Sequence, residues 1–297
     1  MAMVNSNSLF SLNGQPVADS LPLSLLSDRG LAYGHGLFES ILLNQSQLRL
    51  VDRHLSRFAD GANALDIPIE STVILQYVNS FVDQLKAESV SEGVVKVMVT
   101  AGIGGRGYKS PKRVEPTVIC SYSNLPEDIS YYRTQPLSVR FCQHRLSANQ
   151  PLAGIKHLNR LDQIVARNEW RCENYDEGLM FNQSNCLVEA ISANVFIKNN
   201  SGQWITPCLK EVGVAGVMRS VMIEEIFPAC DIPVSISQIS RDELIQSQVL
   251  LTCNSIRGLA SVGSMYNHQN QWVKSLPIDQ QTLMLRKKLI ELYPQYQ

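Results

Sequence analysis

Apolar residues recur at helical spacing in two stretches of the first half of the chain. Over 52–65 they repeat every three or four residues, which predicts an amphipathic helix, and the same spacing over 73–85 predicts a second one. Shorter apolar runs at 37–43, 94–100 and 117–121 have the length and composition of buried strands. Both helices are therefore expected to pack on a sheet.

The second half of the chain alternates the same two patterns. We expect strands at 137–142, 179–181, 186–190 and 249–252, and helices from Lys156 to about Asn174, over 217–227 and over 279–292. Ser240 and Glu243 have the spacing of a capping box before a short helix. Strands mixed with helices throughout predict an α/β (α+β) fold.

Turn residues indicate how these elements are joined. Asn13-Gly14 lies between apolar residues and suits the positive φ angles of a tight hairpin, and Asn199-Asn200-Ser201-Gly202 predicts another hairpin. The stretch from Gly30 to Gly36 holds three glycines directly before the first buried strand. Glycines there permit the close approach of another backbone segment.

The length of the chain favours two domains. At 297 residues it exceeds the size at which a single core usually divides. The polar stretch 124–136 carries two prolines and is the predicted linker. It would separate an N-terminal α/β domain, 1–123, from a C-terminal domain, 137–297, that carries Lys156.

Composition narrows the class of ligand. The chain is 44% hydrophobic and 18% charged with a formal net charge of -1, so disorder, nucleic-acid binding and binding to acidic membranes are not indicated. A small neutral or anionic ligand is expected.

The seven cysteines are widely spread without a C-x-x-C pair, which predicts neither a disulfide framework nor a metal site. No cationic leader or long apolar run is present, so we expect a cytoplasmic protein.

A glycine motif at 102–107 has the form G-x-G-x-x-G and follows a predicted strand. A dinucleotide site needs a helix to begin at the third glycine, whereas Pro111 and Pro116 disfavour one here. The motif therefore predicts a loop that presents Arg106 to an anion.

Lys156 is the first candidate for covalent chemistry. Most lysines are solvated surface residues, which is the alternative interpretation. If a helix begins at Lys156, its polar face carries Asn159, Arg160, Gln163 and Arg167, and its buried face carries Leu158, Leu161, Val165 and Trp170. A half-desolvated lysine near other cations has a lowered pKa, as a Schiff-base nucleophile requires.

A pyridoxal-phosphate site needs further groups, and the sequence offers a candidate for each. Glu189 ends an apolar strand and could hold the protonated pyridine nitrogen. Arg57 could bind the phosphate, although an ordinary exposed arginine is the alternative. Gly216-Val217-Met218 opens a helix with backbone N–H groups, and Asn254-Ser255 follows a strand end, so both could also reach a phosphate.

Six motifs together resemble the class IV pyridoxal-phosphate aminotransferase family. They are D-R-G-L-A-Y-G-H-G-L-F-E-S at 28–40, H-L-S-R-F at 54–58, G-G-R-G-Y at 104–108, L-A-G-I-K-H-L-N-R-L at 152–161, V-E-A-I-S-A-N-V-F at 188–196 and G-V-M-R at 216–219. The resemblance implies a two-domain fold-type-IV enzyme, similar to D-amino-acid aminotransferase, that binds pyridoxal 5'-phosphate. It also implies a homodimer with pockets at the subunit interface.

The resemblance implies a role for each matching position. Lys156 would be the Schiff-base lysine and Glu189 the partner of the pyridine nitrogen, with Ser40 as a proton relay. The other cofactor-binding positions would be Arg57, Ser192, Ala193, Asn194, Val217, Met218, Asn254 and Ser255. Substrate would be bound by Phe38, Arg106, Tyr108 and His35.

Within the family, the motifs around Arg106 and Lys156 are most similar to aminodeoxychorismate lyases. This similarity implies conversion of 4-amino-4-deoxychorismate to 4-aminobenzoate and pyruvate, a step of folate biosynthesis. The family usually has Asp at the position of His35, often Thr at Ser40, and in many lyases Arg at Ala101. A D-amino-acid or branched-chain aminotransferase and a non-catalytic relative are the alternatives.

Overall fold

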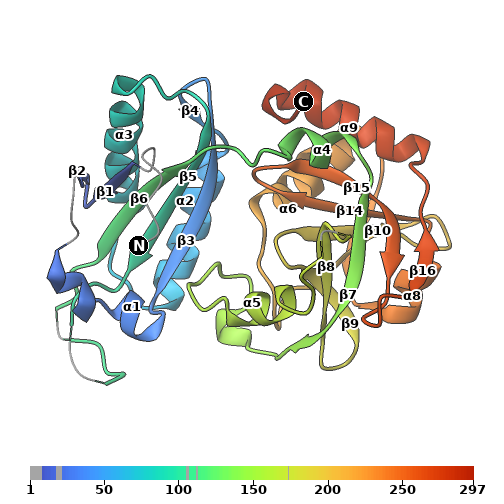
Figure 1. The fold of residues 1–297 in the computed structure, drawn as a ribbon, viewed down its shortest axis with the longest axis horizontal. Coiled ribbons are helices and arrows are strands. Elements are labelled where there is room, and N and C mark those ends of the chain that lie inside the picture. Colours follow the sequence, from blue (N-terminus) through green and yellow to red (C-terminus); the bar gives the residue numbers. More distant parts are fainter. Residues whose placement is uncertain (1–8, 18–21, 105–106, 112, 173) are drawn as a thin grey trace. The chain divides into compact units, whose positions relative to one another are not determined.

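The computed structural model describes residues 9–17, 22–104, 107–111, 113–172 and 174–297 (Figure 1). The chain forms two compact units. The first unit contains residues 1–126 and 155–159, and the second contains 127–154 and 160–297.

An antiparallel sheet organises the described part of the first unit. Its strands run in the order β2-β1-β6-β5-β3-β4, and all neighbours are antiparallel. Their bounds are β1 Phe10–Leu12, β2 Gln15–Pro16, β3 Gly36–Asn44, β4 Gln47–Leu48, β5 Gly93–Thr100 and β6 Thr117–Ser123. The strands predicted over 37–43, 94–100 and 117–121 are therefore confirmed.

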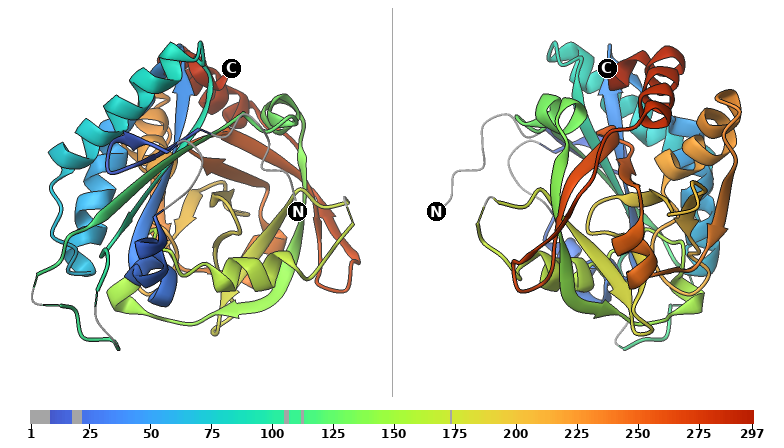
Figure 2. Two further views of the ribbon diagram at one scale, coloured as in Figure 1. Left: turned by 60° about the vertical axis from the view of Figure 1, so that its left-hand side comes forward. Right: turned by 90° about the vertical axis from the view of Figure 1, so that its right-hand side faces the viewer.

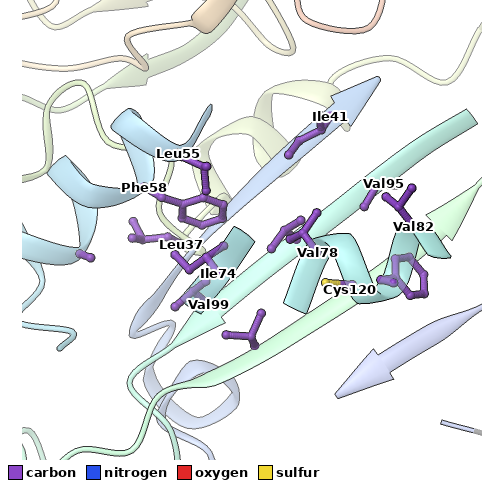
Figure 3. Packing of buried hydrophobic residues seen from close by; sticks show 14 of the residues in the cluster. Leu37, Ile41, Leu55, Phe58, Ile74, Val78, Val82, Val95, Val99 and Cys120 are labelled. Atoms are coloured by element: carbon purple, nitrogen blue, oxygen red, sulfur yellow. The ribbon is translucent and has the colours of Figure 1, made fainter. Parts of the chain in front are cut away.

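The two predicted amphipathic helices are also confirmed and cover one face of this sheet. They are α2, Val51–Ala64, and α3, Ser71–Ala87 (Figures 1 and 2). Figure 3 shows their apolar side chains, among them Phe58 and Val78, in one core cluster with Leu37 from the sheet. A short 3-10 helix η1, Leu23–Ser27, and helix α1, Arg29–Tyr33, precede β3.

The predicted hairpin at Asn13-Gly14 joins β1 to β2. Asn13 has a φ of 48° and Gly14 a φ of 78°, the left-handed conformations that a two-residue turn of this type requires. The Asn13 side chain accepts the Val118 N–H at 2.8 Å, which ties the turn to β6.

A mixed sheet organises the described part of the second unit. Its order is β12-β11-β10-β14-β15-β7-β8-β9-β13, and β16 pairs with β15. The bounds are β7 Leu137–Leu146, β8 Glu177–Asn182, β9 Cys186–Ala190, β10 Asn194–Lys198, β11 Trp204–Pro207, β12 Val234–Ser237, β13 Ile239–Ser240, β14 Val249–Asn254, β15 Gly258–Tyr266 and β16 Trp272–Ser275. The sheet is curved (Figure 2), and its interior side chains form a second hydrophobic core.

The helices of the second unit lie between or beside these strands. They are α4 Ile129–Thr134, η2 Gln150–Leu152, α5 Leu161–Arg167, α6 Val217–Val221, η3 Met222–Ile226, α7 Phe227–Ala229, α8 Arg241–Gln246, α9 Gln280–Leu292 and η4 Pro294–Tyr296. The helix predicted over 217–227 is confirmed as the run α6, η3 and α7, in which η3 is a π-helix. The capping box is also confirmed, because Ser240 accepts the Glu243 N–H at 3.1 Å.

The helix predicted from Lys156 to Asn174 is wrong at both ends. Among the described residues of this range, only Leu161–Arg167 are helical, and Lys156 lies before them in an extended segment. The predicted buried face is wrong as well, since the Leu161 side chain is 72% exposed and Val165 is 50% exposed. The apolar spacing there marks an exposed face of α5, whereas Trp170, beyond its end, is buried.

The predicted linker at 124–136 is not uniformly irregular, because it contains α4. Residues 155–159 pack with the first unit, whereas the sequence suggested that the C-terminal domain carries Lys156. No helix in the described parts of the chain is long and apolar enough to cross a membrane.

Candidate active site

Lys156 is held at the edge of the first unit's sheet. Its carbonyl accepts the Phe38 N–H at 3.0 Å, and the Leu158 N–H donates to the Gly36 carbonyl at 2.9 Å. His157 forms an antiparallel bridge with Leu37 between these two bonds. The segment therefore extends the sheet beside β3, although it lies more than a hundred residues further along the chain.

The alternation of an extended segment orients Lys156. Ile155 packs into the core beside Leu37, so the next side chain points to the opposite face of the sheet. On that face the Lys156 Nζ lies 4.3 Å from the centroid of the Phe38 ring. The Lys156 amine is thus placed by main-chain hydrogen bonds rather than by a helix, which corrects the predicted placement.

The glycines before β3 make room for this segment, as their sequence suggested. A Cβ atom on Gly34, which has a φ of 67°, would lie 2.0 Å from the Asn159 Oδ1 atom. A Cβ atom on Gly36 would lie 2.7 Å from a Leu158 methyl carbon and 2.6 Å from the Val99 carbonyl oxygen. All three distances are shorter than real Cβ contacts, so glycine at these two positions suits the close approach of the Lys156 segment.

Phe38 also contacts a second lysine. Lys96, on β5, has its Nζ 5.1 Å from the centroid of the same ring. Ser40 pairs with Lys96 in the register of β3 and β5 and lies on the same face as Phe38, two residues along the strand. Phe38, Ser40 and Lys156 therefore share one face of the first unit.

A buried carboxylate occupies the helix side of β3. Glu39 accepts hydrogen bonds from His54 Nδ1 at 2.6 Å and from Arg57 Nε at 2.6 Å, and Arg57 Nη2 also contacts its Oε2. His54 and Arg57 lie three residues apart on α2, so both reach the same acceptor. Arg57 is consequently a half-buried, oriented guanidinium and not the exposed arginine that was the alternative.

The charges of this cluster are fixed by their mutual contacts. Burial raises the pKa of Glu39, but Arg57 and the hydrogen bonds from His54 and Arg57 outweigh it and lower the pKa to about 2. Burial lowers the pKa of His54, as do the charges of Arg57 and Lys156, against the opposing effect of Glu39. At neutral pH the cluster therefore holds an anionic Glu39, a cationic Arg57 and a neutral His54.

In the second unit, Glu189 is a buried acceptor. It lies in β9 and is 4% exposed. Its Oε2 accepts the Val214 N–H at 2.8 Å, and its Oε1 accepts the amide of Gln163 at 3.4 Å. A buried carboxylate of this kind is the hydrogen-bond acceptor that a protonated pyridine nitrogen requires.

The start of α6 is fixed by Asn194. The Asn194 amide donates to the Val214 carbonyl at 2.8 Å, and a Cβ on Gly216 would lie 1.9 Å from the Asn194 Oδ1 atom. Gly216 caps the helix that begins at Val217 and Met218, both of which have buried side chains. These two residues can therefore contribute only main-chain groups to a ligand.

Ser192 and Asn254 belong to a polar cluster in the same unit. The Ser192 hydroxyl contacts Glu177 Oε2 and accepts from Arg257 Nη2 at 2.7 Å, while Arg257 pairs with Glu177 at 2.8 Å. Asn254 donates to the Ser192 carbonyl and accepts the N–H of Arg257 at 2.8 Å. The Ser192 side chain thus anchors a buried ion pair, while the turn that contains Ser255 follows β14.

Apart from Phe38 in β3, the predicted substrate residues come from two segments of the sequence: His35 directly precedes β3, and Arg106 and Tyr108 follow β5. Arg106 lies outside the described residues. Tyr108 is 89% exposed and stacks edge-on against Tyr33, with ring centroids 5.6 Å apart. His35 is half-buried between Arg29 and Leu65, and Ala101 is fully buried in the first core. The described residues 102–104 and 107–111 form no helix, as Pro111 and Pro116 suggested.

Sequence interpretation did not identify Glu39 and His54. The available signal was an acidic residue inside an otherwise apolar strand, because a buried carboxylate requires a partner. His54 and Arg57, on one face of the following helix, were the candidates for that partner.

Residues 36–265 match the model of the family described as amino-transferase class IV. The chain belongs to the class IV aminotransferase family.

Similar proteins include both lyases and aminotransferases. An aminodeoxychorismate lyase of Vibrio harveyi is 30% identical over 89% of this chain and 93% of its own length. A D-alanine aminotransferase of Staphylococcus aureus is 23% identical over 75% of this chain and 76% of its own. The crystal structure of 4-amino-4-deoxychorismate lyase from Pseudomonas aeruginosa has a TM-score of 0.85 and 34% identity, covering 95% of this chain and 98% of that one. The mixed two-unit α/β fold is thus that of the fold-type-IV enzymes.

Proposed function

We propose that this chain is a pyridoxal-phosphate-dependent lyase that converts 4-amino-4-deoxychorismate to 4-aminobenzoate and pyruvate. The observation that carries the proposal is the presentation of Lys156 on the edge of β3, beside Phe38, in a chain similar to two aminodeoxychorismate lyases over nearly their whole lengths.

The residues of the two units fit the chemistry of this cofactor. Lys156 supplies an amine for its aldehyde, Glu189 a buried carboxylate for its ring nitrogen, and Arg57 an oriented guanidinium for its phosphate. Main-chain N–H groups at Val217 and Met218 are further phosphate donors, since the first N–H groups of a helix have no partner within it. When bound, the cofactor supplies an electron-withdrawing ring that accepts the electron pair of the broken bond.

The protein's own residues would then control protons and orientation. Lys156 removes the proton from the amine-bearing carbon of the substrate. Ser40 lies on the same face and carries a hydroxyl that can relay this proton. Glu189 keeps the ring nitrogen protonated, because an anionic acceptor favours the cationic form. Arg57 fixes the phosphate end, with Glu39 and His54 holding its side chain.

The substrate side of the site would recognise carboxylates. Arg106 is proposed to bind a substrate carboxylate, for which a planar guanidinium is well suited. Phe38 would line the site, and Tyr108 belongs to the same side. Both ring nitrogens of His35 are hydrogen-bonded, to Arg29 and to the Leu65 carbonyl, so His35 would support this side without contacting the substrate. Loss of the enolpyruvyl group as pyruvate leaves an aromatic ring, and the two products account for every atom of the substrate. The lyase reaction therefore needs no second substrate.

A product assay tests the proposal. The purified protein is loaded with pyridoxal phosphate and incubated with 4-amino-4-deoxychorismate, and both products are quantified. Equal amounts of 4-aminobenzoate and pyruvate are expected. Steady formation of glutamate from D-alanine and 2-oxoglutarate, without 4-aminobenzoate, would refute the lyase.

That second outcome is the alternative function, an aminotransferase of the D-amino-acid or branched-chain type. Similarity to the D-alanine aminotransferase favours it, since the same lysine and carboxylate serve both reactions. The need for an oxo-acid acceptor separates the two activities.

We also propose a cytoplasmic homodimer whose partner subunit completes each pocket. Exposed apolar side chains support the dimer, with Leu23, Leu26 and Leu31 in the first unit and α5 in the second. The free cysteines support a reducing compartment. Light scattering should give about twice the 33.2 kDa of one chain, and a single-chain mass at every concentration would contradict the dimer.

A further inference from the structure

Arg29 is a buried arginine whose hydrogen bonds converge on one loop. It lies in α1 and is 2% exposed. Its Nη1 donates to the carbonyl of Gly107 at 3.1 Å, and its Nη2 donates to the carbonyl of Tyr108 at 2.9 Å. The fork of a single guanidinium thus binds two consecutive carbonyls between β5 and β6.

Tyr33, one turn along the same helix, binds the same loop. Its hydroxyl accepts the Gly107 N–H at 3.1 Å, and its ring packs edge-on against Tyr108. The Arg29 guanidinium lies 5.0 Å from the centroid of the Tyr33 ring. Both the N–H and the carbonyl of Gly107 are therefore tied to α1.

His35 fixes the third arm of Arg29. The Arg29 Nε donates to His35 Nδ1 at 3.2 Å, so Nδ1 must carry a lone pair and the ring proton must lie on Nε2. Nε2 then donates to the Leu65 carbonyl at 2.7 Å, at the end of α2. The imidazole uses one acceptor and one donor, which connect Arg29 to the helix that carries Arg57.

We propose that Arg29 is a positioning residue for substrate binding, acting through Gly107 and Tyr108, and that His35 holds Arg29 in place. The inference rests on the proposed function, in which Tyr108 lies on the substrate side of the site. Arg29 touches no reacting atom in this scheme. Its loss should weaken substrate binding and leave the chemistry at Lys156 intact.

Steady-state kinetics of Arg29→Lys test this role. The lysine keeps the charge but cannot bind two carbonyls and an imidazole at once. We expect KM for 4-amino-4-deoxychorismate to rise about tenfold or more, as for the loss of a buried hydrogen-bonded contact, with kcat within about twofold of wild type. A KM equal to that of the wild type, or an equal loss in kcat, would overturn the proposal.

A matched control comes from the second unit. Arg140 is also buried and donates to two carbonyls, those of Glu169 and His268, so Arg140→Lys removes a similar fork elsewhere. It should leave KM unchanged.

At position 35, Gln can accept from Arg29 and donate to Leu65, whereas Leu can do neither. His35→Gln should retain most of the wild-type KM and His35→Leu should raise it; equal KM values would contradict the role of His35.

Limited trypsin digestion supplies a readout that does not depend on the reaction. Lys109 and Arg113 are exposed cleavage sites beside the tethered carbonyls. Arg29→Lys and His35→Leu should be cut there several times faster than wild type, and Arg140→Lys at the wild-type rate. Equal cleavage of all the proteins would refute the role of Arg29 and His35 in holding this loop, whatever the lyase assay shows. If the two variants are cut faster but the wild type forms no 4-aminobenzoate, only the proposed function is refuted.

Discussion

Glu39→Gln removes the carboxylate that binds His54 and Arg57 and leaves a neutral isostere. Because the folded pKa of Glu39 is about 2 and its ordinary value is 4.5, the carboxylate stabilises the folded state at neutral pH. At about 1.4 kcal/mol for each pKa unit, the difference corresponds to about 3 kcal/mol. This agrees with the ~3–5 kcal/mol typical of breaking one side of a buried ion pair.

The pH dependence has a defined sign. A lowered folded pKa gives stability that is fully present above pH 4.5 and is lost as the pH falls toward 2. Glutamine does not titrate. The difference between wild type and Glu39→Gln should therefore be about 3 kcal/mol at pH 7 and should shrink steadily below about pH 4.5.

Hydrogen exchange during urea unfolding can measure this difference locally. Peptides from β3 and α2, analysed by mass spectrometry, report the opening of the first unit. Asp83→Asn is the control, because Asp83 forms only an exposed pair with Lys86 at 2.9 Å and should change stability by less than about 0.5 kcal/mol. A difference for Glu39→Gln that is below about 1 kcal/mol, or that is the same at pH 7 and pH 3, would refute the assignment of charges in this cluster.

Three further substitutions test other parts of the site. Glu189→Gln should lower kcat about a hundredfold or more in the product assay at full cofactor loading, because a neutral amide no longer favours the protonated ring; a near-normal kcat would exclude that role. Gly34→Ala should destabilise the first unit by about 1–3 kcal/mol and reduce activity, since the new methyl group meets Asn159 and the φ is positive; hydrogen exchange of 155–159 would show it, and unchanged exchange would contradict it. Glu177→Gln should lower the free energy of unfolding of the second unit by about 3–5 kcal/mol, because it leaves the Arg257 charge without its carboxylate. Tryptophan fluorescence can follow this unfolding, since the three tryptophans lie in the second unit, and a loss below about 1 kcal/mol would contradict the importance of the pair.

Local patterns predicted most of the regular elements of the first unit. The spacing of apolar residues in α2 and α3 is set by the sheet beneath them, so it appears directly in the sequence. The Asn13-Gly14 turn requires two positive φ angles that few other residue pairs adopt easily. In the second unit, β15 was not predicted. Two glycines and two serines, Gly258, Ser261, Gly263 and Ser264, interrupt its apolar residues, which weakens the apolar signal of a strand.

The placement of Lys156 could not be predicted from its own neighbours. Helical spacing of apolar residues after it belongs to an exposed face of α5, whereas Lys156 itself pairs with β3, a strand from the other half of the sequence. Such pairing leaves no local signal. The glycines Gly34 and Gly36 did indicate a close approach, but they could not identify which segment made it.

The central claim is that Lys156, and not the second amine at the Phe38 ring, binds the cofactor. Borohydride reduction of the loaded protein followed by peptide mapping tests it directly, since reduction fixes the cofactor to whichever lysine holds it. The cofactor mass is expected on the peptide that contains Lys156 and should be absent from a Lys156→Ala protein treated in the same way. Its recovery on the peptide that contains Lys96, whose Nζ lies 5.1 Å from the same ring, would contradict this assignment.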